Sequence, residues 1–200
     1  MTTVAVVDYG MGNRRSVEKA FEHVGADVSV TGDHDAIRAA DAVVVPGVGA
    51  FPEAMRRLSA QGLDRVISER AAEGTPVLGI CLGMQLLFET SAEHEGATGL
   101  GLLGGEVTPL SAPKLPHIGW NRVAFERPSA LTEGLGDAAA FYHVHSFVCR
   151  TSDDADVVGR GEYGERFASI VERDNVAGVQ FHPEKSSGDG LALLRNFVAQ

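Results

Sequence analysis

Residues 79–83, Gly79-Ile80-Cys81-Leu82-Gly83, follow an apolar run and constrain the fold more tightly than any other segment. The pattern G-x-C-x-G predicts a strand that turns sharply into a helix and displays a cysteine at the turn, as in the nucleophile elbow of hydrolases. Flanking glycines allow the sharp turn and leave space for a substrate, while the helix N-terminus favours a thiolate over a thiol. The alternative is a buried structural cysteine, the state of most free cysteines.

A second apolar run ends at residues 178–184 in His182-Pro183-Glu184. Pro183 cannot donate to a sheet, so we expect the strand to stop there. Nucleophilic acyl transfer needs an attacking group, a proton shuttle and a group that orients the shuttle. His182 alone could be an ordinary core or surface histidine, but together with the cysteine elbow it predicts a catalytic set of Cys81, His182 and Glu184.

Apolar β-rich runs alternate with helical patterns through the first half, which is typical of a parallel sheet covered by helices on both faces. Strands are expected at residues 4–7, 28–30, 43–45 and 77–80, and helices at 14–24, 53–58 and 63–72. Further short strands are expected around 107 and at 122–125, 139–148, 157–160, 167–172 and 176–181, with a turn at 174–175 and a closing helix at 191–198. The predicted fold class is α/β, an open, mostly parallel sheet flanked by helices with additional antiparallel strands in the second half.

Composition limits the domain organisation, the location and the partners that this chain could have. With 200 residues, 44% of them hydrophobic, we expect one soluble domain over residues 1–200 and no membrane span. The start of the chain has no charged leader followed by an apolar signal segment, which predicts a cytoplasmic location. A net charge of −10 argues against nucleic acid or an anionic membrane as the main partner. Two cysteines are too few for a disulfide framework, and Cys149 is expected in the core.

Five motifs together carry a family resemblance. The elbow at residues 79–85, the loop at 46–51 and the segment 181–186 resemble class I (triad) glutamine amidotransferases. Residues 116–121 and 142–147 resemble one branch of that family, the glutaminase subunits of imidazole glycerol phosphate synthase. The motifs occur in the family's order and span nearly the whole chain.

The resemblance implies hydrolysis of the side-chain amide of glutamine through a cysteine thioester, without a cofactor. The backbone N–H groups of Leu82 and of Val48 or Gly49 would form the oxyanion hole.

The resemblance also implies substrate contacts. Gln85, Glu93, His145, Ser146 and Phe147 would bind glutamine. The family commonly has two adjacent acids at 92–93, whereas this chain has Ala92, so either Glu93 or Glu95 could meet the substrate ammonium. His143 and His145 could instead be packing residues or a chance metal pair, but no further ligands are spaced to complete a site, and no metal is predicted.

The expected partner is a (β/α)₈ cyclase subunit that uses the ammonia to make imidazole glycerol phosphate and an aminoimidazole carboxamide ribotide in histidine biosynthesis. Free ammonia would be protonated in water, and this chain's length is expected to be used by the glutaminase core, so a second polypeptide must shield and consume it. Asn13, Trp120, Tyr142 and Lys185 match family positions at that interface. Taken alone, Trp120 could be a core aromatic and Lys185 a solvated charge.

Val48 separates two glycines in the loop where many related glutaminases have adjacent glycines. Valine resists positive φ, so the peptide beside it is expected to rest with its N–H turned away until partner and acceptor ligand bind. The isolated chain should then have low glutaminase activity.

Two other functions fit parts of the sequence. The glutaminase subunit of pyridoxal phosphate synthase shares the triad, but that branch does not normally contain the segment at 116–121. An inactive amidotransferase-like binding or redox module is the other alternative, and the intact Cys81, His182 and Glu184 argue against it.

Overall fold

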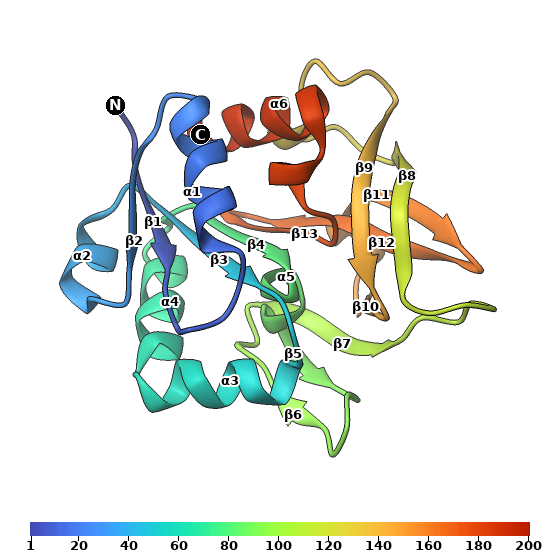
Figure 1. Ribbon diagram of the computed structural model, residues 1–200, viewed down its shortest axis with the longest axis horizontal. Helices are drawn as coiled ribbons and strands as arrows, with labels where there is room; N and C mark the ends of the chain where they lie inside the picture. Colours follow the sequence, from blue (N-terminus) through green and yellow to red (C-terminus); the bar gives the residue numbers. More distant parts are fainter.

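A single 13-stranded sheet runs through the computed structural model, which describes residues 1–200 (Figure 1). Its first half is parallel, in the order β2 (Asp27–Thr31), β1 (Thr3–Val7), β3 (Ala42–Gly47), β4 (Val77–Cys81) and β13 (Val176–Val179). The path continues through β12 (Glu165–Arg173), β10 (Phe147–Thr151), β7 (Leu103–Pro109), β5 (Phe88–Ser91) and β6 (Ala97–Thr98). The predicted fold class is confirmed.

Helices cover both faces of the parallel half, because β1, β3, β4 and β13 are buried on both sides and alternate residues point to opposite faces. Strand β2 is a partly exposed edge strand. The helices are α1 (Arg14–His23), α2 (His34–Ala39), α3 (Phe51–Ala60), α4 (Leu63–Ala72), the short α5 (Leu82–Leu86) and α6 (Ser187–Val198). Val4 and Val6 pack with α1 and α6, whereas Ala5 and Val7 belong to the second core with α2, α3 and α4. Figure 1 shows α1 and α6 together on one side of the strands and α3 and α4 on the other.

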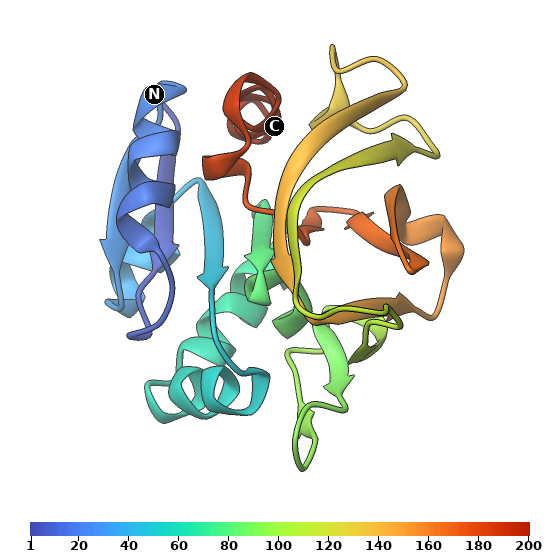
Figure 2. The same cartoon turned by 45° about the vertical axis from the view of Figure 1, so that its right-hand side comes forward.

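The antiparallel part lies in the second half of the chain, as expected. The hairpin of β8 (His117–Phe125) and β9 (Ala138–His145) pairs with β11 (Val157–Tyr163), which in turn pairs with β12. Figure 2 shows β8 and β9 curving together beside β11 and β12. Short 3₁₀ turns occur at η1 (Ala130–Thr132), η2 (Asp154–Asp156) and η3 (Pro183–Lys185).

Several element boundaries differ from the expectations. The run at 139–148 is two strands, because the chain leaves its partner β8 after His145 and pairs with β7 and β12 from Phe147 onward. The last strand ends at Val179, and Pro183 begins η3. Helix α2 and strands β5 and β6 were not predicted, although Asp33 caps α2 by accepting a hydrogen bond from the backbone N–H of Ala36.

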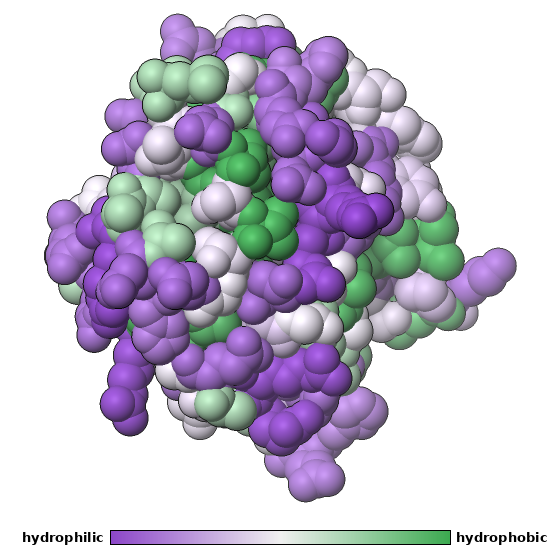
Figure 3. Space-filling view, turned by 60° about the vertical axis from the view of Figure 1, so that its left-hand side comes forward, coloured by the Kyte–Doolittle hydropathy of each residue, from purple (hydrophilic) through white to green (hydrophobic).

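The face turned forward in Figure 3 is mainly hydrophilic, with hydrophobic residues in small separate groups. None of the helices combines the length and the apolar character that crossing a membrane would need.

Candidate active site

Cys81 lies where β4 ends and α5 begins, at the predicted elbow. Its backbone has φ 56° and ψ −110°, a conformation that non-glycine residues rarely adopt. Helix α5, which follows the sulfur, is five residues long. A strained residue between a buried strand and a helix is typical of a displayed nucleophile.

The flanking glycines allow the elbow to pack closely. A Cβ on Gly83 would lie 1.7 Å from the carbonyl oxygen of Val45, and a Cβ on Gly79 would lie 2.6 Å from the carbonyl of Gly83. Neither glycine has a positive φ. Close approach of β3, β4 and α5 therefore excludes a side chain at both positions.

His182 and Glu184 form a buried pair that follows β13, the neighbour of β4. The Nδ1 atom of His182 donates to Oε1 of Glu184 at 2.9 Å, and both side chains are almost fully buried. Burial opposes the charged form of His182, but hydrogen bonds to Cys81 and Glu184 outweigh it and raise the pKa of His182 to about 9. The imidazole therefore holds a proton beside the sulfur more strongly than an ordinary histidine does.

One pocket of about 330 Å³ joins the predicted catalytic and substrate-binding residues. It is lined by Val48, Gly49, Cys81, Leu82, Gln85, Glu93, Val144, His145, Ser146, Phe147, His182 and Lys185. Glu95 is exposed and does not line it, which favours Glu93 among the two candidate acids. Lys185, expected at a partner interface, also borders this pocket.

The loop after β3 approaches the elbow because Gly47 pairs in register with Cys81. The hydroxyl of the buried Tyr9 donates to the carbonyl of Pro46 at 2.7 Å and fixes the start of this loop. Gly49 has φ 109°, whereas Val48 has no positive φ. The backbone N–H groups of Val48 and Gly49 have no hydrogen-bond partner within the chain.

Glu93 reaches the pocket from the other side. Its Oε2 atom accepts a hydrogen bond from the backbone N–H of Phe51, at the start of α3, at 2.7 Å. This contact holds the carboxylate at the pocket wall, and its Oε1 atom lies 4.0 Å from Nε2 of His94. A carboxylate in this place suits an ammonium group.

Three buried histidines are held in neutral form: His145 lines the pocket, and His117 and His143 pack beside it. Burial lowers the pKa of His117, lowers that of His143 to about 3 and lowers that of His145 to about 4. Nδ1 of His145 lies 2.9 Å from the carbonyl of Phe147, and Nδ1 of His117 lies 3.0 Å from Nε2 of His145. The Phe147 carbonyl can only accept, so His145 donates to it and accepts from His117. The chain contains no cluster of three or more His, Cys, Asp or Glu side chains that could hold a metal ion.

The proposed interface residues occupy three places: the β8–β9 hairpin, the pocket that Lys185 borders, and the start of α1. Trp120 is 54% exposed and packs edge-on against Tyr142, its cross-strand neighbour, with ring centroids 6.2 Å apart. Ile118, two residues earlier on the same face, is 60% exposed. Asn13 precedes α1 and does not line the pocket. Trp120 is thus a surface aromatic and not the core residue weighed as an alternative.

Sequence reasoning missed two residues that touch the sulfur. The carbonyl of Val144 lies 3.7 Å from Sγ of Cys81, and Nε2 of Gln180 lies 3.9 Å from it. For Gln180, a glutamine within the apolar run 176–181 was a usable signal.

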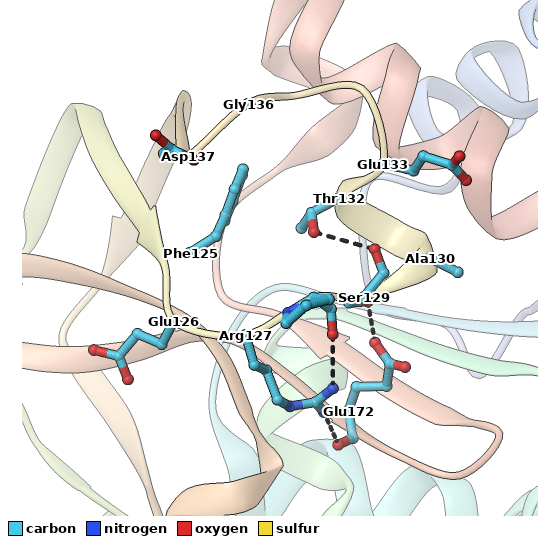
Figure 4. A pocket seen from close by; sticks show the side chains of 11 residues that line it. Phe125, Glu126, Arg127, Ser129, Ala130, Thr132, Glu133, Gly136, Asp137 and Glu172 are labelled. Carbon is cyan, nitrogen blue, oxygen red and sulfur yellow. Dashed lines mark hydrogen bonds between the residues drawn. The ribbon is translucent and has the colours of Figure 1, made fainter.

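A larger pocket of about 790 Å³ lies near η1, away from Cys81 (Figure 4). Its polar groups bind one another. The guanidinium of Arg127 donates to the carbonyls of Glu172 and Pro128, and the hydroxyl of Ser129 donates to the Glu172 carboxylate. These bonds close the turn after β8.

A cysteine at a strand-to-helix elbow, beside a buried histidine–carboxylate pair on the next parallel strand, is typical of enzymes that form acyl-cysteine intermediates. Residues 5–200 match the family glutamine amidotransferase class-I, and the chain belongs to that family. Two solved structures share the fold: a glutamine amidotransferase (TM-score 0.79, 20% identity, covering 98% of this chain and 97% of that one) and PurLQS from Thermotoga maritima (TM-score 0.80, 23% identity, covering 100% and 99%).

Relatives with higher sequence identity than these two structures come from one branch of the family. The imidazole glycerol phosphate synthase subunit HisH of Moorella thermoacetica is 51% identical over 198 residues, which cover 98% of this chain and 94% of the relative. The protein of the same name from Aquifex aeolicus is 50% identical over 200 residues, covering 98% and 96%. The one from Bacillus cereus strain G9842 is 48% identical over 195 residues, covering 97% and 93%.

Proposed function

We propose that this chain is the glutaminase subunit of an imidazole glycerol phosphate synthase. It hydrolyses glutamine to glutamate and ammonia and supplies the ammonia to a (β/α)₈ cyclase subunit in histidine biosynthesis. The observation that carries the proposal is the convergence of Cys81, the His182–Glu184 pair and Glu93 on one pocket in a chain that is about half identical to subunits of that name. We take residues 1–200 as a single amidotransferase domain.

In the first half-reaction, Nε2 of His182 already holds the proton of the Cys81 thiol, and the sulfur attacks the amide carbon of glutamine. Glu184 holds the imidazole in the tautomer that accepts this proton and stabilises the imidazolium. The carbonyl oxygen becomes negatively charged, and backbone N–H groups of Leu82 and of Val48 or Gly49 stabilise it. His182 then protonates the departing nitrogen, so that ammonia leaves and a glutamyl thioester remains.

In the second half-reaction, His182 deprotonates a water molecule, which attacks the thioester carbon. The C–S bond breaks, glutamate is released and the proton returns to the sulfur. Because ammonia in water at neutral pH is mostly ammonium, productive transfer requires a shielded route to the acceptor.

Substrate binding follows from the polarity of the pocket wall. Glu93 offers a carboxylate to the α-ammonium of glutamine, and Gln85 offers an amide beside it. The segment His145-Ser146-Phe147 borders the α-carboxylate end. These assignments are supported by the common pocket and by the family to which the chain belongs.

The partner would dock on the surface that contains Trp120, Tyr142, Lys185 and Asn13. Trp120 and Ile118 are large exposed hydrophobic residues, and buried aromatic anchors contribute most to protein–protein binding. Tyr142 connects this surface to the site, because its carbonyl accepts a hydrogen bond from the backbone N–H of His182 at 2.9 Å.

The test is ammonia release from glutamine by the chain alone, with the cyclase subunit and with the pyridoxal phosphate synthase partner. We expect turnover with the cyclase, and Cys81→Ala should abolish it while assembly and ammonia-dependent synthesis persist. Turnover retained by Cys81→Ala would refute the mechanism. Stimulation only by the pyridoxal phosphate synthase partner would refute the branch, and inactivity in every combination would favour a binding module.

A further inference from the structure

Gln180 is a fully buried polar side chain next to the nucleophile, with no role in the mechanism above. It follows β13 directly, and β13 pairs with β4 so that Val179 lies beside Ile80. One more step along both strands places Gln180 beside Cys81. Burying an unpaired amide costs about 1–3 kcal/mol in proteins, so both ends of this side chain require partners.

The two ends of the Gln180 amide contact different functional residues. Its Oε1 atom accepts a hydrogen bond from Nε2 of Gln85 at 3.1 Å, and its Nε2 atom lies 3.9 Å from Sγ of Cys81. The backbone N–H of Gln180 donates to the carbonyl of Ser169 at 2.9 Å, which anchors the residue. A single amide therefore bridges the nucleophile and a residue of the substrate pocket.

A backbone carbonyl fixes the direction of this bridge. Nε2 of Gln85 lies 3.3 Å from the carbonyl of Phe147, which can only accept, so the amino end of Gln85 must face it. The same amino group faces Gln180, so Gln180 must present its oxygen there and its N–H groups to the sulfur. The alternative orientation of either amide would place two donors or two acceptors face to face.

The sulfur gains most from this donor when it is charged. Its neighbour on the other side is the carbonyl of Val144, 3.7 Å away, which can accept from a thiol but repels a thiolate. An N–H donor binds an anion about twice as strongly as it binds a neutral acceptor. The Gln180 amide donates a hydrogen bond to Sγ in the structure.

We propose that Gln180 is a further catalytic residue. Its Nε2–H group stabilises the Cys81 thiolate, while its Oε1 atom holds the amino end of the Gln85 amide toward itself. This inference rests on the glutaminase function proposed above. Because both N–H groups of Gln85 are used by Phe147 and Gln180, its Oε1 atom is the group left to meet a donor on the substrate. Gln180 thus acts on both the nucleophile and the binding pocket.

The test is the pH dependence of Cys81 alkylation by iodoacetamide in the full chain, followed by mass spectrometry on the peptide that contains Cys81. Gln180→Met removes the donor at similar size, and we expect the midpoint of the profile to rise by about one pH unit. Gln180→Glu keeps the acceptor for Gln85 and places an anion near the sulfur, so its shift should be larger. The matched control Gln61→Met, at an exposed glutamine, should leave the profile unchanged.

Profiles of both Gln180 variants that superpose on that of the unaltered chain would overturn the proposal. If neither variant folds, the side-chain ¹⁵N–H signals of Gln180 in the unaltered chain decide the question. They should move downfield as Cys81 ionises, with the Gln61 amide as internal reference, and signals that do not move would equally overturn it. Alkylation needs no glutamine, so this result is independent of whether the glutaminase function is correct.

Discussion

The hydroxyl of Ser186 joins the strand of Tyr142 to the segment of His182. It accepts a hydrogen bond from the backbone N–H of Tyr142 at 3.0 Å and donates to the carbonyl of His182 at 2.6 Å. The surface that contains Tyr142 and Trp120 is therefore rigidly connected to the proton shuttle. Changes at either place should be measurable at the other.

Trp120→Ala should weaken assembly with the cyclase subunit by at least about 2 kcal/mol, or roughly thirtyfold in Kd, because a large aromatic anchor is lost. Isothermal titration of the two subunits measures this change. Arg122→Ala, at an exposed residue on the same strand, is the control and should have a much smaller effect. Equal affinities of the Trp120 variant and the unaltered chain would place the interface elsewhere.

Val48→Gly should raise the glutaminase turnover of the isolated chain by about ten- to a hundredfold, part of the contribution of one oxyanion donor. Glycine adopts positive φ freely, so the loop could turn its N–H toward the pocket without the partner. Val48→Ala is the matched control, because alanine keeps the restriction on φ. Equal gains in both variants would show that side-chain size, and not backbone freedom, limits the isolated chain.

The His182–Glu184 pair should make stability fall in mild alkali. The pKa of His182 is raised to about 9 from about 6.5, so the folded chain holds a proton that the unfolded chain releases. The resulting stabilisation, about 1–3 kcal/mol, is complete below pH 6.5 and is lost as the pH rises through 9. Urea unfolding from pH 6 to 10 should show this loss, and His182→Gln should flatten it.

The buried neutral histidines should destabilise the chain in acid. His143 and His145 have pKa values lowered to about 3 and about 4. Between these values and pH 6.5, the unfolded chain therefore binds protons that the folded chain does not bind. Stability should fall by several kcal/mol as the pH drops from 6.5 toward 4. His143→Phe should reduce the slope, whereas His23→Gln, at an exposed histidine, should keep it. Parallel slopes for the unaltered chain and the His143 variant would contradict the assignment.

Gly83→Ala should destabilise the chain by at least about 3 kcal/mol, because the new methyl group would overlap the Val45 carbonyl. Thermal unfolding measures the loss. Gly188→Ala, where a Cβ meets nothing within 4 Å in α6, should be neutral or slightly stabilising. A well-folded Gly83 variant would mean that the elbow can open, and its activity would then show whether the sulfur stays in place.

Local pattern was sufficient to predict the parallel core, since Val4–Val7 and the run ending at Cys81 are unbroken apolar strands between helical segments. The same holds for the positions of Cys81 and His182, because both follow strands whose carboxyl ends meet at one edge. The break at Ser146 was not predictable, because it arises from a change of strand partner and has no glycine or proline to mark it. Which atoms of Gln180 and His145 donate hydrogen bonds and which accept them is determined by the backbone carbonyl of Phe147. No local sequence pattern contains this contact.

The backbone conformation of Cys81 lowers the folding stability of the chain at the residue that carries the reactive sulfur. A left-handed backbone at a side chain larger than hydrogen costs about 1–3 kcal/mol, and replacing Cys81 by glycine would relieve that strain while deleting the sulfur. Alanine or serine at this position would keep the strain, so an inactive alanine variant isolates the chemical role of the thiol from any conformational gain. The chain therefore accepts a cost in folding stability at the residue whose side chain does the chemistry.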